Sequence, residues 1–172
     1  ALEETEDNIS NNKLNAAQSS SQQSIENMKK MIEKITSAQE NFQNQSLNEM
    51  TEKFEEIIQD VLYLSAKEEY LNNGLKNITS RSPRIKFFAS QQQLVQDQLR
   101  SVTNKMINLS KETFAITPAI GRGIGKASSS MDLAKIKLAD RNILEAKNNQ
   151  IIAIEGLNQI VIELYNNMKD MQ

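Results

Sequence analysis

The glycine-rich stretch TPAIGRGIGKASSS, residues 117–130, is the segment whose residue types come closest to a site for chemistry. A phosphate-binding loop needs Gly, four residues, Gly-Lys and then Ser or Thr, placed after a β-strand. Counting back from Gly125-Lys126, Ile120 stands where the first glycine should be, and Ala127 stands where the hydroxyl should be. An amphipathic helical pattern precedes the stretch. We therefore expect no nucleotide to bind here.

Read as a helix, the same stretch predicts close packing against a neighbouring helix. Thr117 followed by Pro118 is a good helix start, and Gly121 and Gly125 then lie four residues apart on one face. Small residues at this spacing allow two helix backbones to approach, so Gly125→Leu should destabilise the fold. An anion site at the helix N-terminus is the alternative interpretation.

Glu52, Glu56 and Asp60 share a helix face at i, i+4 and i+8, an arrangement that could bind a hard cation. They lie off the apolar seam, which favours a solvated acidic stripe and no metal site. The chain has no histidine and no cysteine, so the usual general base, the usual metal ligands and thiol chemistry are all excluded. We expect no catalytic residues and no cofactor, and hence no enzyme.

Four polar residues stand at positions where the apolar pattern calls for buried side chains. For Glu68 we favour an ion pair with an arginine across the bundle; the alternative is a point where the seam opens to water. Gln39, Gln92 and Gln150 are expected to fix the register by hydrogen bonds between helices.

Charge is segregated along the chain although the net charge is only −2. Residues 1–75 carry 6 basic and 14 acidic side chains, whereas residues 76–147 carry 13 basic and 5 acidic ones. We interpret this as internal complementarity between helices. A sharper hypothesis is a basic patch for anionic lipid or another acidic partner, and less readily for nucleic acid, centred on Arg81, Arg84 and Lys86.

The elements that carry these residues are helices, because apolar side chains recur in alternating steps of three and four. Between residues 42 and 47 the seam slips by one position, which favours a turn; one bent, continuous helix is the alternative. Pro83, Pro118 and the stretch around Asp140 mark further breaks. The successive seams begin at Ile25, Leu47, Phe88, Ile120 and Ala146.

Short connections between long helices force neighbouring helices to run in opposite directions. The predicted fold is all-α: an elongated, antiparallel up-and-down bundle of four to five long helices with coiled-coil-like seams. Residues 1–18 are polar and are expected to form a flexible or frayed segment, and residues 19–172 the bundle domain. Ile57, Leu99 and Leu157 should be buried.

Three segments, residues 60–71, 114–131 and 141–168, resemble in that order the C-terminal helical region of a family of large uncharacterised bacterial envelope proteins with a membrane anchor. They read DVLYLSAKEEYL, FAITPAIGRGIGKASSSM and RNILEAKNNQIIAIEGLNQIVIELYNNM. The resemblance covers about residues 60–172 and implies a cell-envelope location, with no activity and no catalytic residues.

The expected function is a non-enzymatic helical interaction or scaffolding domain that binds a protein partner or a second copy. The alternative is a helical ligand-sensing domain that transmits a signal along the bundle. We expect the chain to be a fragment, soluble by itself, of a longer protein. Contact with a membrane would then come only through an anchor outside it.

Overall fold

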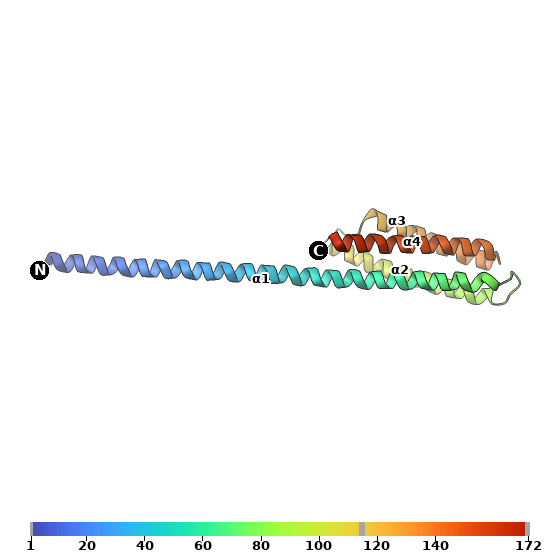
Figure 1. Ribbon diagram of the computed structural model, residues 1–172, viewed down its shortest axis with the longest axis horizontal. Coiled ribbons are helices and arrows are strands. Elements are labelled where there is room, and N and C mark those ends of the chain that lie inside the picture. Colours follow the sequence, from blue (N-terminus) through green and yellow to red (C-terminus); the bar gives the residue numbers. More distant parts are fainter. Residues whose placement is uncertain (1, 114–115, 171–172) are drawn as a thin grey trace. The chain divides into compact units, whose positions relative to one another are not determined.

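The computed structural model describes residues 2–113 and 116–170, with side chains described at 18, 19 and from 21 onward in these ranges (Figure 1). Within them all regular structure is helical and no β-strand occurs, which confirms the all-α class. The elements are α1 (Leu2–Gly74), the short 3-10 turn η1 (Leu75–Asn77), α2 (Ile85–Glu112), α3 (Pro118–Ala139) and α4 (Ile143–Asp170).

The chain divides into two compact units, residues 1–46 (unit 1) and 47–172 (unit 2). Helix α1 contributes to both units, and it includes residues 2–18, which were expected to be flexible or frayed. The division between the units falls after residue 46, whereas the sequence predicted a boundary after residue 18.

The predicted turn between residues 42 and 47 is wrong, because α1 continues through this segment. The seven residues from Phe42 to Asn48 include neither glycine nor proline, so nothing in the backbone chemistry ends the helix. The one-residue slip in the apolar pattern changes which face of the helix is apolar and leaves its hydrogen bonding unchanged.

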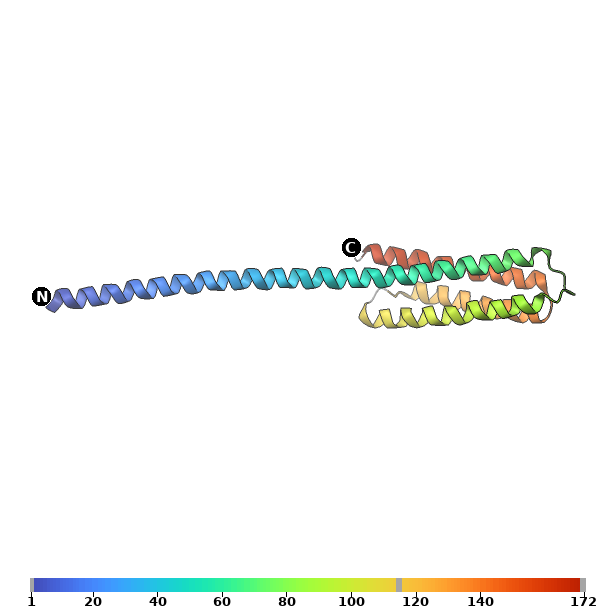
Figure 2. The same ribbon diagram turned by 90° about the horizontal axis from the view of Figure 1, so that it is seen from below.

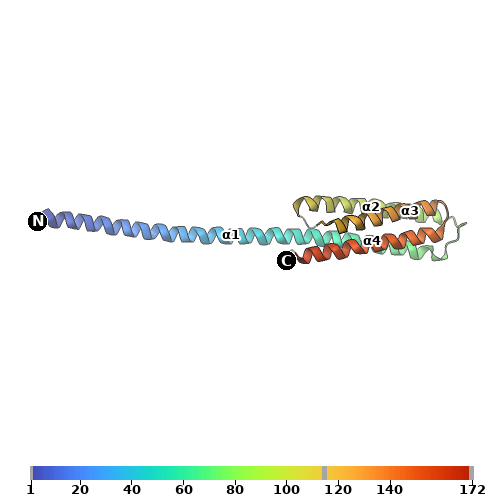
Figure 3. The same ribbon diagram turned by 90° about the horizontal axis from the view of Figure 1, so that it is seen from above.

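In unit 2 the four helices pack against one another around one core, as Figures 2 and 3 show from two sides. The loop between α1 and α2 and the turn between α3 and α4 lie at the same end of this unit (Figure 2). Arg141 of that turn donates a hydrogen bond from Nη1 to the backbone oxygen of Ser80 in the loop, over 2.9 Å. This bond ties the two connections together.

The core of unit 2 is made by the predicted seams. Ile57, Leu99 and Leu157 are 3 %, 1 % and 0 % exposed, so the expectation that they are buried is confirmed. The largest fully buried side chains come from all four α-helices and from η1: Phe54, Leu64, Leu75, Phe88, Leu99, Met106, Ile120, Met131, Leu138, Leu157, Ile160 and Leu164.

The predicted helix boundaries at Pro118 and near Asp140 are confirmed. Helix α3 begins at Pro118, and its first backbone bond runs from the Gly121 amide to the Thr117 oxygen, over 3.2 Å. In the turn after α3, Arg141 has a positive φ of 60°. The side-chain oxygen of Asn142 then accepts a hydrogen bond from the backbone amide of Glu145, which caps the start of α4.

Candidate functional site

The first apolar seam differs from the others, because its side chains are exposed. Ile25, Ile32 and Phe42 are 51 %, 64 % and 74 % exposed. With the intervening seam positions they form a continuous row along α1 in unit 1, which we call the apolar stripe. Its members are Ile25, Met28, Ile32, Ile35, Gln39 and Phe42.

Apart from Lys29, which borders the apolar stripe, the charged residues of this part of α1 lie away from it. Glu26 and Lys30 form an ion pair of 2.8 Å, one helical turn apart. Met31, which is 62 % exposed, instead widens the stripe on one side. A helix with one apolar and one charged face is a helix built to bury its apolar face.

The expected close packing at Gly121 and Gly125 is wrong. A Cβ atom added at either position would meet no atom within 4 Å. The close contact is instead made by Gly123 of α3 and Gly156 of α4, both buried. A Cβ on Gly156 would lie 2.8 Å from the Ala127 amide nitrogen and 3.0 Å from the Gly123 oxygen. Residues 118–130 are helical, as expected, but the face that packs against α4 contains Gly123 and not Gly121 or Gly125.

A second feature is a polar layer inside the core of unit 2, made by Glu68 and Asn72 of α1, Gln92 of α2 and Gln150 of α4. Gln92 Nε2 donates to both carboxylate oxygens of Glu68, at 2.8 and 2.9 Å. Gln150 Nε2 donates to Gln92 Oε1 at 2.8 Å, and Asn72 Nδ2 donates to Gln150 Oε1 at 3.3 Å. Each amide thus donates a hydrogen bond to the next side chain of the layer, and the series ends at the Glu68 carboxylate.

The predicted arginine partner for Glu68 is wrong, since the facing side chain is the amide of Gln92. The alternative, a seam open to water, is also wrong because Glu68 is fully buried. Burial raises the pKa of Glu68 from 4.5 to about 7, and the Gln92 hydrogen bond lowers it only in part. The expected hydrogen bonding between helices is confirmed for Gln92 and Gln150, whereas Gln39 is exposed.

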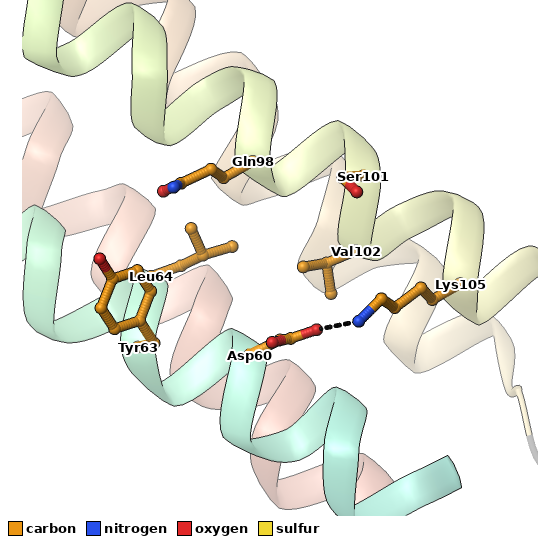
Figure 4. A pocket seen from close by; sticks show the side chains of 7 residues that line it. All are labelled: Asp60, Tyr63, Leu64, Gln98, Ser101, Val102 and Lys105. Atoms are coloured by element: carbon orange, nitrogen blue, oxygen red, sulfur yellow. Dashed lines mark hydrogen bonds and ion pairs between the residues drawn. The ribbon is translucent and has the colours of Figure 1, made fainter.

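A shallow cavity of about 230 Å³ lies between α1 and α2 (Figure 4). Its one close polar contact in the figure joins Lys105 Nζ to Asp60 Oδ2 over 2.7 Å, and Lys105 also reaches Glu56 Oε1 at 2.6 Å. The hydrogen bond to Asp60, then that to Glu56, raises the pKa of Lys105. The ammonium group of Lys105 is thus held between the two carboxylates. The lining residues are Asp60, Tyr63, Leu64, Gln98, Ser101, Val102 and Lys105.

The same ion pairs involve the acidic row of α1, made by Glu52, Glu56 and Asp60. Of its three carboxylates, Glu56 and Asp60 both pair with the single ammonium group of Lys105 across the helix interface. Among the described residues, no group of three or more acidic side chains is arranged to hold a metal ion. The row serves to connect α1 to α2.

Arg81, Arg84 and Lys86 all lie exposed at the start of α2 and in the loop before it. The Arg84 guanidinium carbon lies 5.8 Å from the centre of the Phe88 ring, so this side chain covers the edge of the core. Phe87 beside it is 52 % exposed. The three cations therefore share one end of unit 2, and they line none of the cavities described for the chain.

Within the described residues, none of the helices has both the length and the apolar character needed to cross a bilayer. Comparisons with protein-family models, with curated proteins and with solved structures find no match to this chain. The resemblance to bacterial envelope proteins therefore stays a prediction.

Two features of these sites were not predicted from the sequence. The facing glycines Gly123 and Gly156 could have been found by continuing the Ile120, Ala127, Met131 face through residue 123. The exposure of the apolar stripe could not, because its pattern is the same as that of the buried seams.

Proposed function

We propose that this chain is a non-enzymatic helical interaction and scaffolding module. Unit 2 is its folded body, an up-and-down bundle whose helices run antiparallel to their neighbours. Unit 1 carries the binding surface, the apolar stripe of α1. The partner is a protein that supplies a second apolar helix face.

The exposure of the apolar stripe carries this proposal. Burying a side chain of this size contributes about 1.5–3 kcal/mol relative to leaving it in water. Five such side chains stand in one row on one face, from Ile25 to Phe42. Exposed rows of this kind mark surfaces for protein contact.

The test is photo-crosslinking from the two faces of this helix. A photoreactive phenylalanine analogue is placed at Ile32 or Phe42 in the stripe, and at Ser37 on the opposite face as a control. The full chain is then irradiated in extract of its source cells. We expect protein adducts from the two stripe positions and several-fold fewer from position 37. Equal yields from both faces, or no adducts, would contradict the proposal.

The resemblance of residues 60–172 supports a further part of the proposal, that the module belongs to a larger membrane-anchored protein of the bacterial envelope. Antibodies raised against the chain should then detect it in the envelope fraction of its source cells. Recovery only from the cytoplasmic fraction would contradict this location.

A ligand-sensing domain is the second candidate, favoured by a cavity of about 310 Å³ between α2 and α3. Its walls combine the apolar Leu99 and Ile124 with the polar Arg100, Asn104 and Ser128. If a small molecule binds there, Ile124→Trp should fill the space and abolish any ligand-induced rise of the melting temperature. A library of metabolites that leaves the native melting temperature unchanged would exclude this function.

A further inference from the structure

We propose that the apolar stripe binds the same stripe of a second copy of this chain, parallel and in register, as a two-stranded coiled coil. This inference rests on the proposed function, since it names the partner of the same surface.

The spacing of the stripe fits a coiled coil. Its steps of three and four continue without interruption from residue 25 to residue 42, which places Ile25 and Ile32 at heptad position a. Isoleucine at position a favours two parallel strands when leucine occupies position d. Here position d holds Met28, Ile35 and Phe42, so the choice of two strands rests on the polar residue at position a. Since a heptad repeat keeps its seam turned towards a partner helix, the whole row is covered at once.

Gln39 selects the orientation. It is the one polar residue of the stripe, and it occupies position a. In a parallel, in-register pair each residue meets its own counterpart, so the amide of Gln39 faces an identical amide that can both donate and accept. An antiparallel pair over the same span would set Gln39 against Met28 and leave a polar group without a partner, at a cost of about 1–3 kcal/mol.

The flanking positions do not oppose a second copy. In a parallel pair, position g of one helix meets position e of the other, one heptad later. The pairs formed are Ser24 with Lys29, Met31 with Thr36, and Ala38 with Gln43. No two like charges meet, and Glu26, Glu33 and Glu40 all lie at position b, away from the seam. Two identical surfaces related by a two-fold axis form the commonest kind of oligomer.

Single cysteines provide the experiment, because the native chain has none. The full-length Ile25→Cys and Phe42→Cys variants mark the two ends of the stripe, and Ser37→Cys on the far face is the matched control. After mild oxidation, each stripe variant alone should form a disulfide-linked dimer. Its yield should exceed that of the control at least about tenfold, because the seam holds the two thiols close together. Sedimentation equilibrium of the native chain should give twice the 19.5 kDa of one copy.

Two further variants test the stripe itself. Ile32→Lys should return the mass to that of one chain while the thermal midpoint of unit 2 stays the same. Gln39→Ile should keep the chains associated but remove the preference for the parallel form, because no buried amide then needs an identical partner. Crosslinking between Ile25→Cys and Phe42→Cys chains, each in the Gln39→Ile background, should then appear in a mixture.

Several results would overturn the inference. The native mass could stay that of one chain or reach that of three. Disulfides could also form only when the Ile25→Cys and Phe42→Cys variants are mixed, which would indicate antiparallel pairing. If the photo-crosslinks of the stripe join another protein while the native chain stays a monomer, the second-copy inference fails and the proposed function stands. If the stripe gives no adducts and no dimer, both fail.

Discussion

At the scale of single residues, the decisive group is the carboxyl of Glu68. It is fully buried, and its hydrogen-bond donor is an amide, which carries no positive charge. Desolvation therefore outweighs the hydrogen bond and raises the pKa of Glu68 to about 7. A carboxyl that is easier to protonate in the folded state than in the unfolded one makes stability depend on pH.

The sign of this dependence follows from the two pKa values of Glu68. Below pH 4.5 both states are protonated there, and the stabilisation is complete. Between pH 4.5 and about 7 the unfolded state loses its proton first, so stability falls as pH rises. From pH 5 to pH 8 this residue should remove about 2–3 kcal/mol from the free energy of unfolding.

Glu68→Gln should abolish that loss, because the amide stays neutral at every pH. Urea unfolding at pH 5 and pH 8 measures the effect, and Glu69→Gln on the exposed neighbour is the control. We expect the advantage of Glu68→Gln over the native chain to grow by about 2–3 kcal/mol between these pH values. Parallel pH profiles of the two proteins would contradict the account of Glu68.

At the scale of elements, the contact between α3 and α4 depends on two facing glycines. The backbones of these two helices approach each other more extensively than those of α2 and α3 do. The reason is local, since a side chain on Gly156 would collide with backbone atoms of Ala127 and Gly123. Backbone atoms cannot rotate away as a flexible side chain can.

Gly156→Ala should therefore destabilise unit 2. Overpacking against backbone costs about 1–3 kcal/mol, which exceeds the gain of at most about 1 kcal/mol from better helix propensity. Gly125→Ala is the matched control, because no atom lies within 4 Å of the added Cβ. It should raise the free energy of unfolding by about 0.5–1 kcal/mol. Thermal or urea melts in which both variants shift in the same direction would refute this contact.

At the scale of the whole molecule, oppositely charged parts of the chain form ion pairs between helices. Lys105, from the basic part of the chain, binds Glu56 and Asp60 of the acidic part. A second cross-helix ion pair joins Lys126 of α3 to Glu155 of α4 at 2.8 Å, although Glu155 lies outside the acidic part of the chain. Because these pairs remain partly exposed, they guide which helices associate more than they stabilise the result.

Lys105→Gln should lower the free energy of unfolding by about 1 kcal/mol or less at low salt. In 1 M NaCl, where the screening length is about 3 Å, the difference from the native chain should shrink. Lys111→Gln on the same helix is the control, since its amine donates to the Asn108 amide at 3.1 Å. A loss that is equal for both variants, or independent of salt, would show that the cross-helix pairs contribute nothing specific.

The sequence by itself determined that the chain is helical and which side chains of residues 54–168 face the core. These properties are local: a step of three or four residues places side chains on one face of a helix, Pro118 begins α3, and the Asn142 side chain caps the start of α4. No knowledge of the neighbouring helices is needed to state them.

Only the tertiary structure decided which apolar faces find a partner within the chain. The seam from Ile25 to Phe42 and the seam from Phe54 to Leu75 have the same spacing, yet the first is exposed and the second is buried. It also decided that Gln92 faces Glu68, and that Gly123 faces Gly156. The physical reason is that contacts between helices depend on how the helices are placed in space, whereas periodicity records only the preference of each helix to bury one face.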